Sequence, residues 1–322
     1  MQELISVIMS TYNEPVSYIS HAVSSILAQT YMNIELIIVA DNPDNCEAVA
    51  YLHQISSHDP RVRLIINKRN LGLPKSLNIA LDHASGAYIA RMDADDISMP
   101  ERLEVQTAFL RENQLDLVGS NIRYMDSQGV ETGKETHYPT SDDCIKRYLR
   151  LASPIPHPTW MIRRTVFTEI GGYESYPASQ DYEFISRMAL RGYRLGNIEQ
   201  PLLKYRINSS GISSKNKILQ KTIKYYIRTC YRAGEESPLE DFERFFDSES
   251  GKKKYKDLEC YYKASDTLKT YKRENKRIKY ALLGIQLFLS SKEARDVLGE
   301  MIAERVFSMG IEPAFDSFWK EY

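Results

Sequence analysis

The chain has 322 residues, and 43% of them are hydrophobic, which is enough to bury the core of one large domain or of one domain with an appendage. Its formal net charge of −1 creates no overall field that would attract nucleic acid, so we expect no nucleic-acid partner. The charge is uneven: residues 1–214 hold 20 Lys and Arg against 25 Asp and Glu, whereas residues 215–322 hold 22 against 18. This asymmetry indicates two functional regions.

The four cysteines have neither CxxC spacing nor a neighbouring Cys or His at metal-site spacing, which is typical of reduced thiols in a cytosolic protein. No basic leader followed by an apolar stretch opens the chain, and no window approaches ~18 continuous apolar residues. We therefore expect a cytoplasmic protein with no signal peptide and no transmembrane helix.

The first hundred residues alternate between short apolar runs and helical patterns. Buried strands are predicted at Leu4–Met9, Ile34–Ala40, Val62–Ile66 and Tyr88–Met92. The helical patterns between them cover Val16–Gln29, Cys46–Ser56 and Lys75–Ala84. Alternation of this kind predicts right-handed crossovers and an α/β fold with a mostly parallel central sheet.

Later elements are less regular. A capping box at Ser98 and Glu101 predicts a helix to about Asn113. The other expected elements are strands at Asp116–Gly119 and Ile122–Met125 and helices at Arg164–Ile170 and Gln180–Arg191. Gly and Pro become scarce after about Ser214, which predicts a helical appendage. We therefore expect a catalytic domain at residues 1–214 and a helical C-terminal region at residues 215–322.

Three carboxylates, Asp93, Asp95 and Asp96, follow the fourth predicted strand. Ligand sites in open α/β sheets lie at the carboxyl ends of strands. Acids this close together repel one another, and a divalent cation such as Mg²⁺ or Mn²⁺ would relieve that repulsion. Taken alone, the motif is equally compatible with a solvated acidic turn before a helix N-terminus, where the helix dipole favours anions.

A single acid, Asp41, follows the second predicted strand at the same edge of the sheet. A carboxylate there could accept the N3–H of a uracil base. The alternative is a turn formed by Asp41 and Asn42, since both residue types favour turns.

In combination, these motifs resemble the inverting family 2 glycosyltransferases with a Rossmann-like GT-A fold, over about residues 4–214. The opening strand and nucleotide loop, the approach to the DxD motif and the motif itself are matched by Ser6–Asn13, Arg69–Gly72, Leu77-Asn78, Ala84–Gly86 and Ile89–Asp96. Ser179–Phe184 resembles the segment that holds the catalytic base, and Tyr205–Asn208 resembles the segment that closes the site.

The resemblance implies a role for each matching residue. The nucleotide-sugar pocket would contain Thr11, Tyr12, Asn13, Glu14, Asp41, Asn70, Lys75, Asp93, Ala94 and Asp95, with Asp41 at the base and Asp93 on the ribose side. Asp95 would ligate the metal, Mn²⁺ or Mg²⁺, and Asp181 would be the general base. His157, Arg206 and Asn208 match family positions near the diphosphate or the acceptor.

The chain departs from the family pattern at three positions. Ala40 stands where the family often has a second acid, and Gln180 stands where it often has Glu. Asn208 occupies the region where a His is common, which leaves a third protein ligand to the metal unassigned. Taken alone, Asp181 is also compatible with a carboxylate that only favours a helix N-terminus, and His157 with a structural histidine.

The reaction implied by the resemblance is transfer of a sugar from a nucleotide diphosphate, expected to be UDP, to an acceptor hydroxyl. One base and one metal without a covalent intermediate predict inversion at the anomeric carbon. The acceptor would be a glycan, a lipid-linked sugar or a glycoprotein in bacterial polysaccharide or glycan assembly.

The C-terminal region leaves its role open. Apolar residues repeat at helical spacing over Ile278–Leu289, after a basic stretch at Lys272–Lys279. An interfacial helix of this kind would dock on anionic lipid at the inner face of the cell membrane. The alternatives are a helix that packs on the catalytic domain or on a partner chain in a homodimer.

Two other classes of function compete with the transferase interpretation. A nucleotidyltransferase would show a Gly-rich, basic phosphate loop, but Ser10–Val16 contains no Gly, Lys or Arg. A non-catalytic nucleotide-sugar-binding or scaffold protein would have no need of Asp93, Asp95 and Asp181 together.

Overall fold

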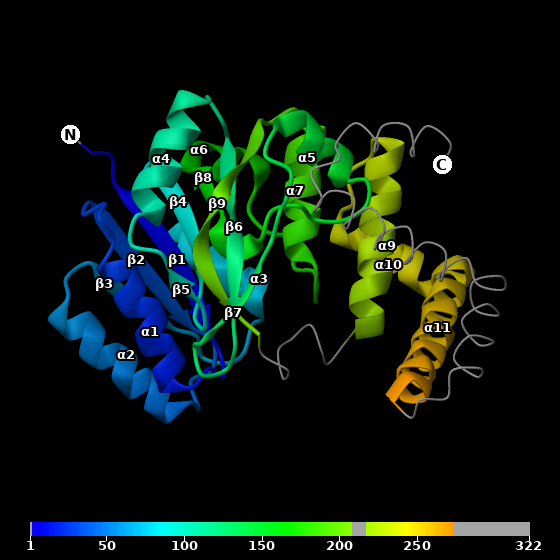
Figure 1. Ribbon diagram of the computed structural model, residues 1–322, viewed down its shortest axis with the longest axis horizontal. Coiled ribbons are helices and arrows are strands. Elements are labelled where there is room, and N and C mark those ends of the chain that lie inside the picture. The colour runs from blue at the N-terminus through cyan, green and yellow to red at the C-terminus, as the bar shows by residue number, and fades with distance from the viewer. Residues whose placement is uncertain (1, 208–216, 274–322) are drawn as a thin grey trace. The chain divides into compact units, whose positions relative to one another are not determined.

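A computed structural model describes residues 2–207 and 217–273 of the chain (Figure 1). The chain forms two compact units, Met1–Ser209 and Ser210–Tyr322. Asn208 and the predicted C-terminal helix at Ile278–Leu289 lie outside the described residues.

The first unit is built on a nine-stranded sheet with the order β3-β2-β1-β4-β8-β6-β9-β5, in which β7 also pairs with β6. Its strands are β1 (Ile5–Thr11), β2 (Ile34–Ala40), β3 (Val62–Ile66), β4 (Tyr88–Asp93), β5 (Ile97–Ser98), β6 (Leu117–Met125), β7 (Glu131–Glu135), β8 (Met161–Arg163) and β9 (Leu195–Arg206). Its helices are α1 (Val16–Leu27), α2 (Cys46–His58), α3 (Leu73–Asp82), α4 (Arg102–Glu112), α5 (Asp142–Tyr148), η1 (His157–Thr159), α6 (Arg164–Ile170) and α7 (Gln180–Leu190).

Four parallel strands, β3, β2, β1 and β4, form the N-terminal half of the sheet. The register pairs Thr11 with Ala40 and Ser10 with Asp93, so the carboxyl ends of β1, β2 and β4 meet at one edge. The antiparallel strand β8 then joins β4 to β6. The predicted α/β fold with a mostly parallel central sheet is confirmed.

The two faces of β4 differ in polarity. Ala90 and Met92 belong to the apolar core that includes Ile19 and Val23 of α1. Because successive side chains of a strand alternate between faces, Arg91 and Asp93 point to the opposite side of the sheet. The strand thus uses one face for packing and the other for polar groups.

One sequence prediction differs from the structure in the middle of the sheet. The two short strands expected at Asp116–Gly119 and Ile122–Met125 are a single strand, β6. Ser120 and Asn121, which interrupt the apolar pattern, are buried inside it. Their polar groups are satisfied there, since the Asn121 side chain donates to the Glu199 carbonyl at 2.9 Å and accepts from the Thr136 hydroxyl at 3.1 Å.

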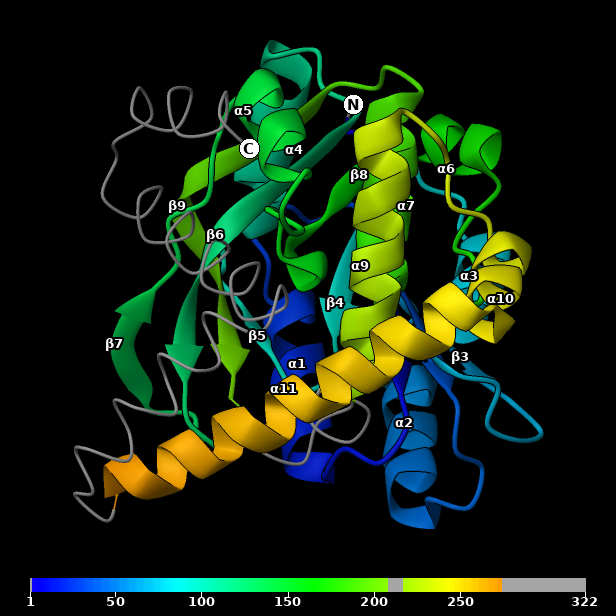
Figure 2. The ribbon, with the colours of Figure 1, turned by 90° about the vertical axis from the view of Figure 1, so that its right-hand side faces the viewer.

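The second unit contains α9 (Lys217–Ala233), α10 (Leu239–Asp247) and α11 (Glu249–Arg273), and α11 contacts both of the others (Figure 2). Aromatic rings hold the three helices together: Tyr226 of α9 stacks on Phe245 of α10 at 5.0 Å between ring centroids, and Phe246 meets Tyr255 of α11 at 5.7 Å. Within the described ranges, no helix has the length and apolar character needed to cross a membrane.

A close approach between β6 and the segment before η1 generates the first prediction. A Cβ atom on Gly119 would lie 2.0 Å from Cγ2 of Ile155 and 2.9 Å from Oδ1 of Asn197. Gly119→Ala should therefore lower the free energy of unfolding by about 1–3 kcal/mol, as overpacking does in buried cores. Urea unfolding measures this effect.

Ile155→Ala supplies the matched control because it removes the methyl group that the new Cβ atom would strike. The double variant Gly119→Ala/Ile155→Ala should then lose less stability than the sum of the two single losses. Additive losses would contradict the steric explanation.

Candidate active site

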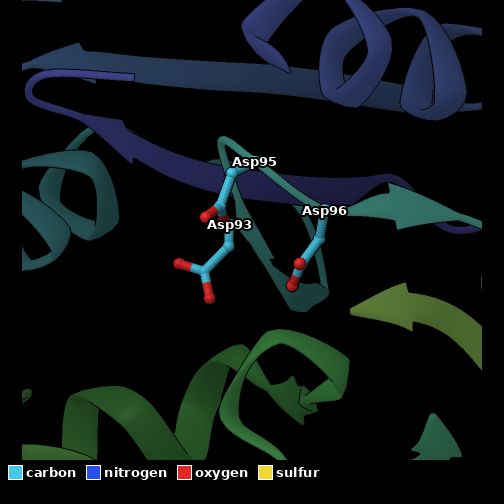
Figure 3. A group of neighbouring side chains, drawn as sticks. All are labelled: Asp93, Asp95 and Asp96. Carbon is cyan, nitrogen blue, oxygen red and sulfur yellow. The ribbon is translucent and has the colours of Figure 1, made fainter. Parts of the chain in front are cut away.

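The acidic turn, Asp93-Ala94-Asp95-Asp96, leaves β4 at the carboxyl edge of the sheet and leads into β5. One carboxylate oxygen from each of the three acids lies within 4.8 Å of the others, and the three side chains converge in Figure 3. Ala94 between them is 2% exposed. The structure therefore brings the predicted acidic group together in one small volume.

Asp93 is the acid whose charge is compensated. Its carboxylate forms an ion pair with the guanidinium of Arg91, which lies two residues earlier on the same face of β4. Arg91 is 3% exposed, and its backbone N–H donates to the Trp160 carbonyl at 2.9 Å. The pairing leaves the turn with two uncompensated carboxyl groups.

Asp96 is the buried acid, at 1% exposure. Burial raises the pKa of Asp96 well above its usual value, and the charges of Asp93 and Asp95 add to that rise. Its Oδ1 accepts the backbone N–H of Arg206 at 2.8 Å, whereas its Oδ2 has no hydrogen-bond partner among the described residues. A buried, unpartnered carboxylate oxygen calls for a ligand such as a cation or a water molecule.

Asp95 is half-buried and forms no ion pair with any side chain in the described part of the chain. Burial, followed by the charges of Asp93 and Glu14, raises the pKa of Asp95 to about 7. Loss of its proton is therefore disfavoured until a positive charge arrives. The three oxygen donors fit Mg²⁺ or Mn²⁺, which would displace the protons of Asp95 and Asp96, while the role of Asp95 as a metal ligand stays a prediction.

Arg206, at the end of β9, fastens the acidic turn to the rest of the domain. Its Nε donates to the Asp95 carbonyl at 2.8 Å, and its Nη1 lies 3.2 Å from the carbonyl oxygens of Asp126 and Ser127. The guanidinium carbon lies 4.1 Å from the ring centroid of Tyr18 in α1. These contacts hold Nε and Nη1 within the protein, whereas Nη2 is buried without a hydrogen-bond partner among the described residues. The predicted place of Arg206 near the diphosphate or acceptor stays a prediction.

The loop after β1 is held by its own side chains. Oε2 of Glu14 accepts the Thr11 hydroxyl at 2.9 Å and the Tyr12 N–H at 2.6 Å. Oδ1 of Asn13 accepts the side-chain amide of Asn42 at 2.7 Å, which connects the loops after β1 and β2. Tyr12 is 41% exposed, so the loop presents an aromatic ring beside the sheet edge.

Asp41, at the end of β2, shapes the loop that leads into α3. Its carboxylate accepts three hydrogen bonds at 2.7–2.8 Å, from the side chain of Asn67 and the backbone N–H groups of Leu71 and Gly72. At 3% exposure, Asp41 organises this loop, a task that the sequence did not indicate. Asn70 on this loop and Lys75 in the first turn of α3 are exposed, and the predicted contact of Asp41 with uracil stays a prediction.

Asp181 lies in the first turn of α7 and is half-buried. None of the described side chains forms an ion pair with it. The helix itself is fixed by the buried pair of Glu183 and Arg187, at 2.8 Å, since Arg187 also donates to the carbonyls of Ile170 and Gly172. The helix N-terminus thus presents an unpaired carboxylate on a rigid support.

A buried cluster of His157, Tyr173 and Arg91 lies near the acidic turn and near Asp181. His157 Nε2 is 2.9 Å from Tyr173 Oη, and burial with the charge of Arg91 holds the pKa of His157 well below its usual value, so the imidazole is neutral. Burial raises the pKa of Tyr173, and the charges of both Asp181 and Asp93 contribute to that rise. Tyr173 therefore lies within electrostatic reach of the acidic turn and of the predicted base.

Two of these residues, Arg91 and Tyr173, were missed as site residues by sequence reasoning. Arg91 carried a signal, because an arginine inside an otherwise apolar buried strand requires a partner. Tyr173 carried none, since its place depends on Asn78 of α3, whose side chain bonds the Tyr173 N–H and carbonyl at 2.9 Å each.

The sequence family described as Glycosyl transferase family 2 matches residues 6–171, just over half of the chain. The chain belongs to this family. It is therefore a glycosyltransferase, as the acidic turn and its neighbours had suggested.

Several relatives support that assignment. The chain is 37% identical to an uncharacterized glycosyltransferase of Methanocaldococcus jannaschii over 69% of its own length and 77% of the relative's. It is 35% identical to the O-antigen biosynthesis glycosyltransferase WbnJ of Escherichia coli over 71% and 87% of the two chains. The amylovoran biosynthesis glycosyltransferase AmsE of Erwinia amylovora is 28% identical over 66% and 79%.

The fold is shared with S. aureus TarS, residues 1–349, whose crystal structure was solved in complex with UDP-GlcNAc. The TM-score is 0.58 at 18% sequence identity, and the match covers 75% of this chain and 72% of that one. This similarity confirms the predicted GT-A architecture.

The raised pKa of Asp95 generates a stability prediction for the metal-free protein. An unfolded Asp ionises near pH ~3.9, whereas Asp95 in the folded protein ionises at about 7, so between these values the unfolded state binds fewer protons. The ionisation of Asp95 therefore destabilises the fold increasingly as the pH rises toward 7. Asp95→Asn should raise the free energy of unfolding by about 1–3 kcal/mol above pH ~7, and this gain should vanish near pH ~4.

Urea unfolding in a chelator at several pH values measures the gain. Asp44→Asn, an exposed aspartate at the same edge of the sheet, is the matched control and should show no such trend. A gain that stays constant with pH would contradict the raised pKa.

Proposed function

We propose that the protein is a metal-dependent, inverting glycosyltransferase that moves a sugar from a UDP-sugar to an acceptor hydroxyl. The observation that carries the proposal is the convergence of Asp93, Asp95 and Asp96, which each bring a carboxylate oxygen within 4.8 Å of the others. The buried Tyr173 relates this acidic turn to Asp181. The charges of Asp93, in the acidic turn, and Asp181, on α7, both raise the pKa of this one buried tyrosine. A donor bound at the acidic turn would therefore have an unpaired carboxylate nearby to serve the acceptor.

The acidic turn would hold the metal and the nucleotide. A bound Mn²⁺ or Mg²⁺ would compensate the negative charge that develops on the departing nucleoside diphosphate. Asp95 would ligate this ion, because Asp93 is paired with Arg91. Asp96 lies in the same cluster, and its Oδ2 has no hydrogen-bond partner among the described residues. Asp93, held by Arg91, would accept a hydrogen bond from the ribose side of the donor.

Asp181 would act on the acceptor as general base. Its carboxylate takes the proton of the acceptor hydroxyl while the hydroxyl oxygen attacks the anomeric carbon of the sugar. The bond from that carbon to the diphosphate oxygen breaks on the opposite face, so the configuration inverts. A base in this position contributes about 10²–10⁴-fold to the rate.

One structural feature supports a nucleotide at this edge of the sheet, and one comparison supports uridine. The loops after β1 and β2 are cross-linked by the pair Asn13 and Asn42 and present the exposed ring of Tyr12 at the sheet edge. The fold is also one that accommodates UDP and UDP-GlcNAc in S. aureus TarS. We infer that this edge binds the nucleotide of the donor.

The names of two relatives suggest the biological setting. WbnJ is named for O-antigen biosynthesis and AmsE for amylovoran biosynthesis. We propose that the acceptor here is likewise a growing bacterial surface glycan, with residues 1–214 as the catalytic domain on the cytoplasmic side of the membrane. Residues 215–322 would serve the acceptor, the membrane surface or a homodimer partner.

The proposal is tested by a panel of UDP-, GDP- and dTDP-sugars, assayed for thermal stabilisation and slow donor hydrolysis with Mn²⁺ and with chelator. UDP-sugars should stabilise and hydrolyse only with metal, and Asp95→Ala should lose both effects because it removes the proposed ligand. Stabilisation without hydrolysis of any donor would favour a nucleotide-sugar-binding or scaffold protein. Release of pyrophosphate from UTP and a sugar phosphate would identify a nucleotidyltransferase instead.

The role of Asp181 predicts a separation of binding from turnover. Asp181→Asn should lower the rate of donor hydrolysis or transfer by about 10²-fold or more, because the amide cannot accept the proton. Its affinity for UDP with Mn²⁺, measured by calorimetry, should stay at the wild-type value.

The matched control is Asp143→Asn, which neutralises an exposed acid in the first turn of another helix, α5. This variant should keep both turnover and UDP binding. Equal losses of turnover in the two variants would show that Asp181 only stabilises a helix N-terminus.

A further inference from the structure

The three acids of the acidic turn differ in what compensates them, and Arg91 causes the difference. Its guanidinium forms an ion pair with Asp93, at the end of β4, whereas no described side chain pairs with Asp95 or Asp96. Arg91 therefore pairs directly with one of three acids whose oxygens lie within 4.8 Å of one another, and its charge is only a minor influence on the pKa of Asp95 and of Asp96.

Stability of the fold is a poor explanation for Arg91. The side chain is 3% exposed, and its Nε and Nη1 have no hydrogen-bond partner within the described ranges. Buried donors without partners each cost free energy, and a buried ion pair often stabilises less than apolar side chains of the same volume. His157 beside it is neutral and so offers no charge to pair with, and Asp96 is the least of the acidic influences on the pKa of Arg91. The pair with Asp93 is the strongest favourable electrostatic contact of Arg91.

We propose that Arg91 is a positioning residue that reserves Asp93 for the donor and keeps it out of the metal's ligand set. With Arg91 present, the turn offers the cation two uncompensated carboxyl groups, and Asp93 stays oriented as a hydrogen-bond acceptor. Without Arg91, Asp93 would be free to turn toward the cation as a third anionic ligand. This inference rests on the proposed function, because it assumes that metal and nucleotide bind at the acidic turn.

The proposal predicts changes of opposite sign in two affinities. Arg91→Met keeps the length and apolar volume of the side chain but removes its charge. The affinity for Mn²⁺ without nucleotide should rise about three- to tenfold, because a positive charge next to the cation site is gone. The affinity for UDP at saturating Mn²⁺ should fall about tenfold or more, as when a partner that orients a ligand is lost.

Electron paramagnetic resonance of free Mn²⁺ measures the first affinity, and calorimetry with UDP measures the second. Both use the full chain, with far-ultraviolet circular dichroism as the check of folding. The matched control is Arg163→Met, since Arg163 lies on the neighbouring strand β8 and donates to the Leu115 carbonyl at 2.9 Å, away from the acids. This control should leave both affinities unchanged.

Arg91→Lys provides a second test that does not depend on the folding of the Met variant. The ammonium group keeps the positive charge but lacks the planar fork of the guanidinium. Mn²⁺ affinity should therefore stay at the wild-type value, and UDP affinity should fall by less than in Arg91→Met.

The inference would be overturned if the Arg91 variants lost affinity for both Mn²⁺ and UDP, or if neither affinity changed. The proposed function would still stand in that case, provided that the wild-type protein binds both ligands. If the wild-type protein binds neither Mn²⁺ nor UDP, the proposed function itself fails, and this inference fails with it.

Discussion

The mutual repulsion of three carboxylates at the end of one strand is the constraint around which the candidate site is arranged. The repulsion is reduced differently at each acid. The guanidinium of Arg91 compensates the charge of Asp93, and the backbone N–H of Arg206 donates to the buried Asp96. Asp95 keeps its proton up to a pH of about 7. The residues that contact Asp93 and Asp96 belong to the sheet itself, since Arg91 lies on β4 and Arg206 ends β9. A repulsive cluster on flexible loops would separate, whereas here the strand pairing holds it together.

Tyr173 and the segment that leads to Asp181 are positioned by a separate set of hydrogen bonds. Asn78 of α3 holds the backbone of Tyr173, and Arg187 of α7 holds the carbonyls of Ile170 and Gly172. Gly172 has a positive φ of 76°, and a Cβ there would approach the side-chain oxygen of Asn78 to 2.7 Å. The segment that leads to Asp181 is thus tied to the nucleotide side of the sheet through α3. Both acidic groups are positioned by rigid elements of one domain, as transfer between two bound substrates requires.

The sequence was informative wherever a local pattern carried the signal. Strand periodicity placed β1 to β4, and the position of Asp93, Asp95 and Asp96 after a buried strand placed them at the ligand-binding edge. Patterns failed where distant contacts decide: Arg206 meets the acidic turn across 110 positions of sequence, and the three bonds to Asp41 reach up to 31 positions away. The prediction of two strands in place of β6 failed for the same reason. Asn121 is typical of a turn, and only its hydrogen bond to the distant Glu199 carbonyl explains its place inside a strand.

The pairing of Arg91 with Asp93 also bears on the order in which ligands can bind. A turn with two uncompensated carboxyl groups attracts a bare divalent cation less strongly than one with three. The diphosphate of a donor would bring the missing negative charge to the same place, so each ligand would raise the affinity for the other by the same factor. A site with all three acids available would bind the cation well on its own and gain less from the nucleotide. If the proposed metal and donor bind at this turn, a buried arginine that contributes little to stability would make metal binding depend on the presence of the donor.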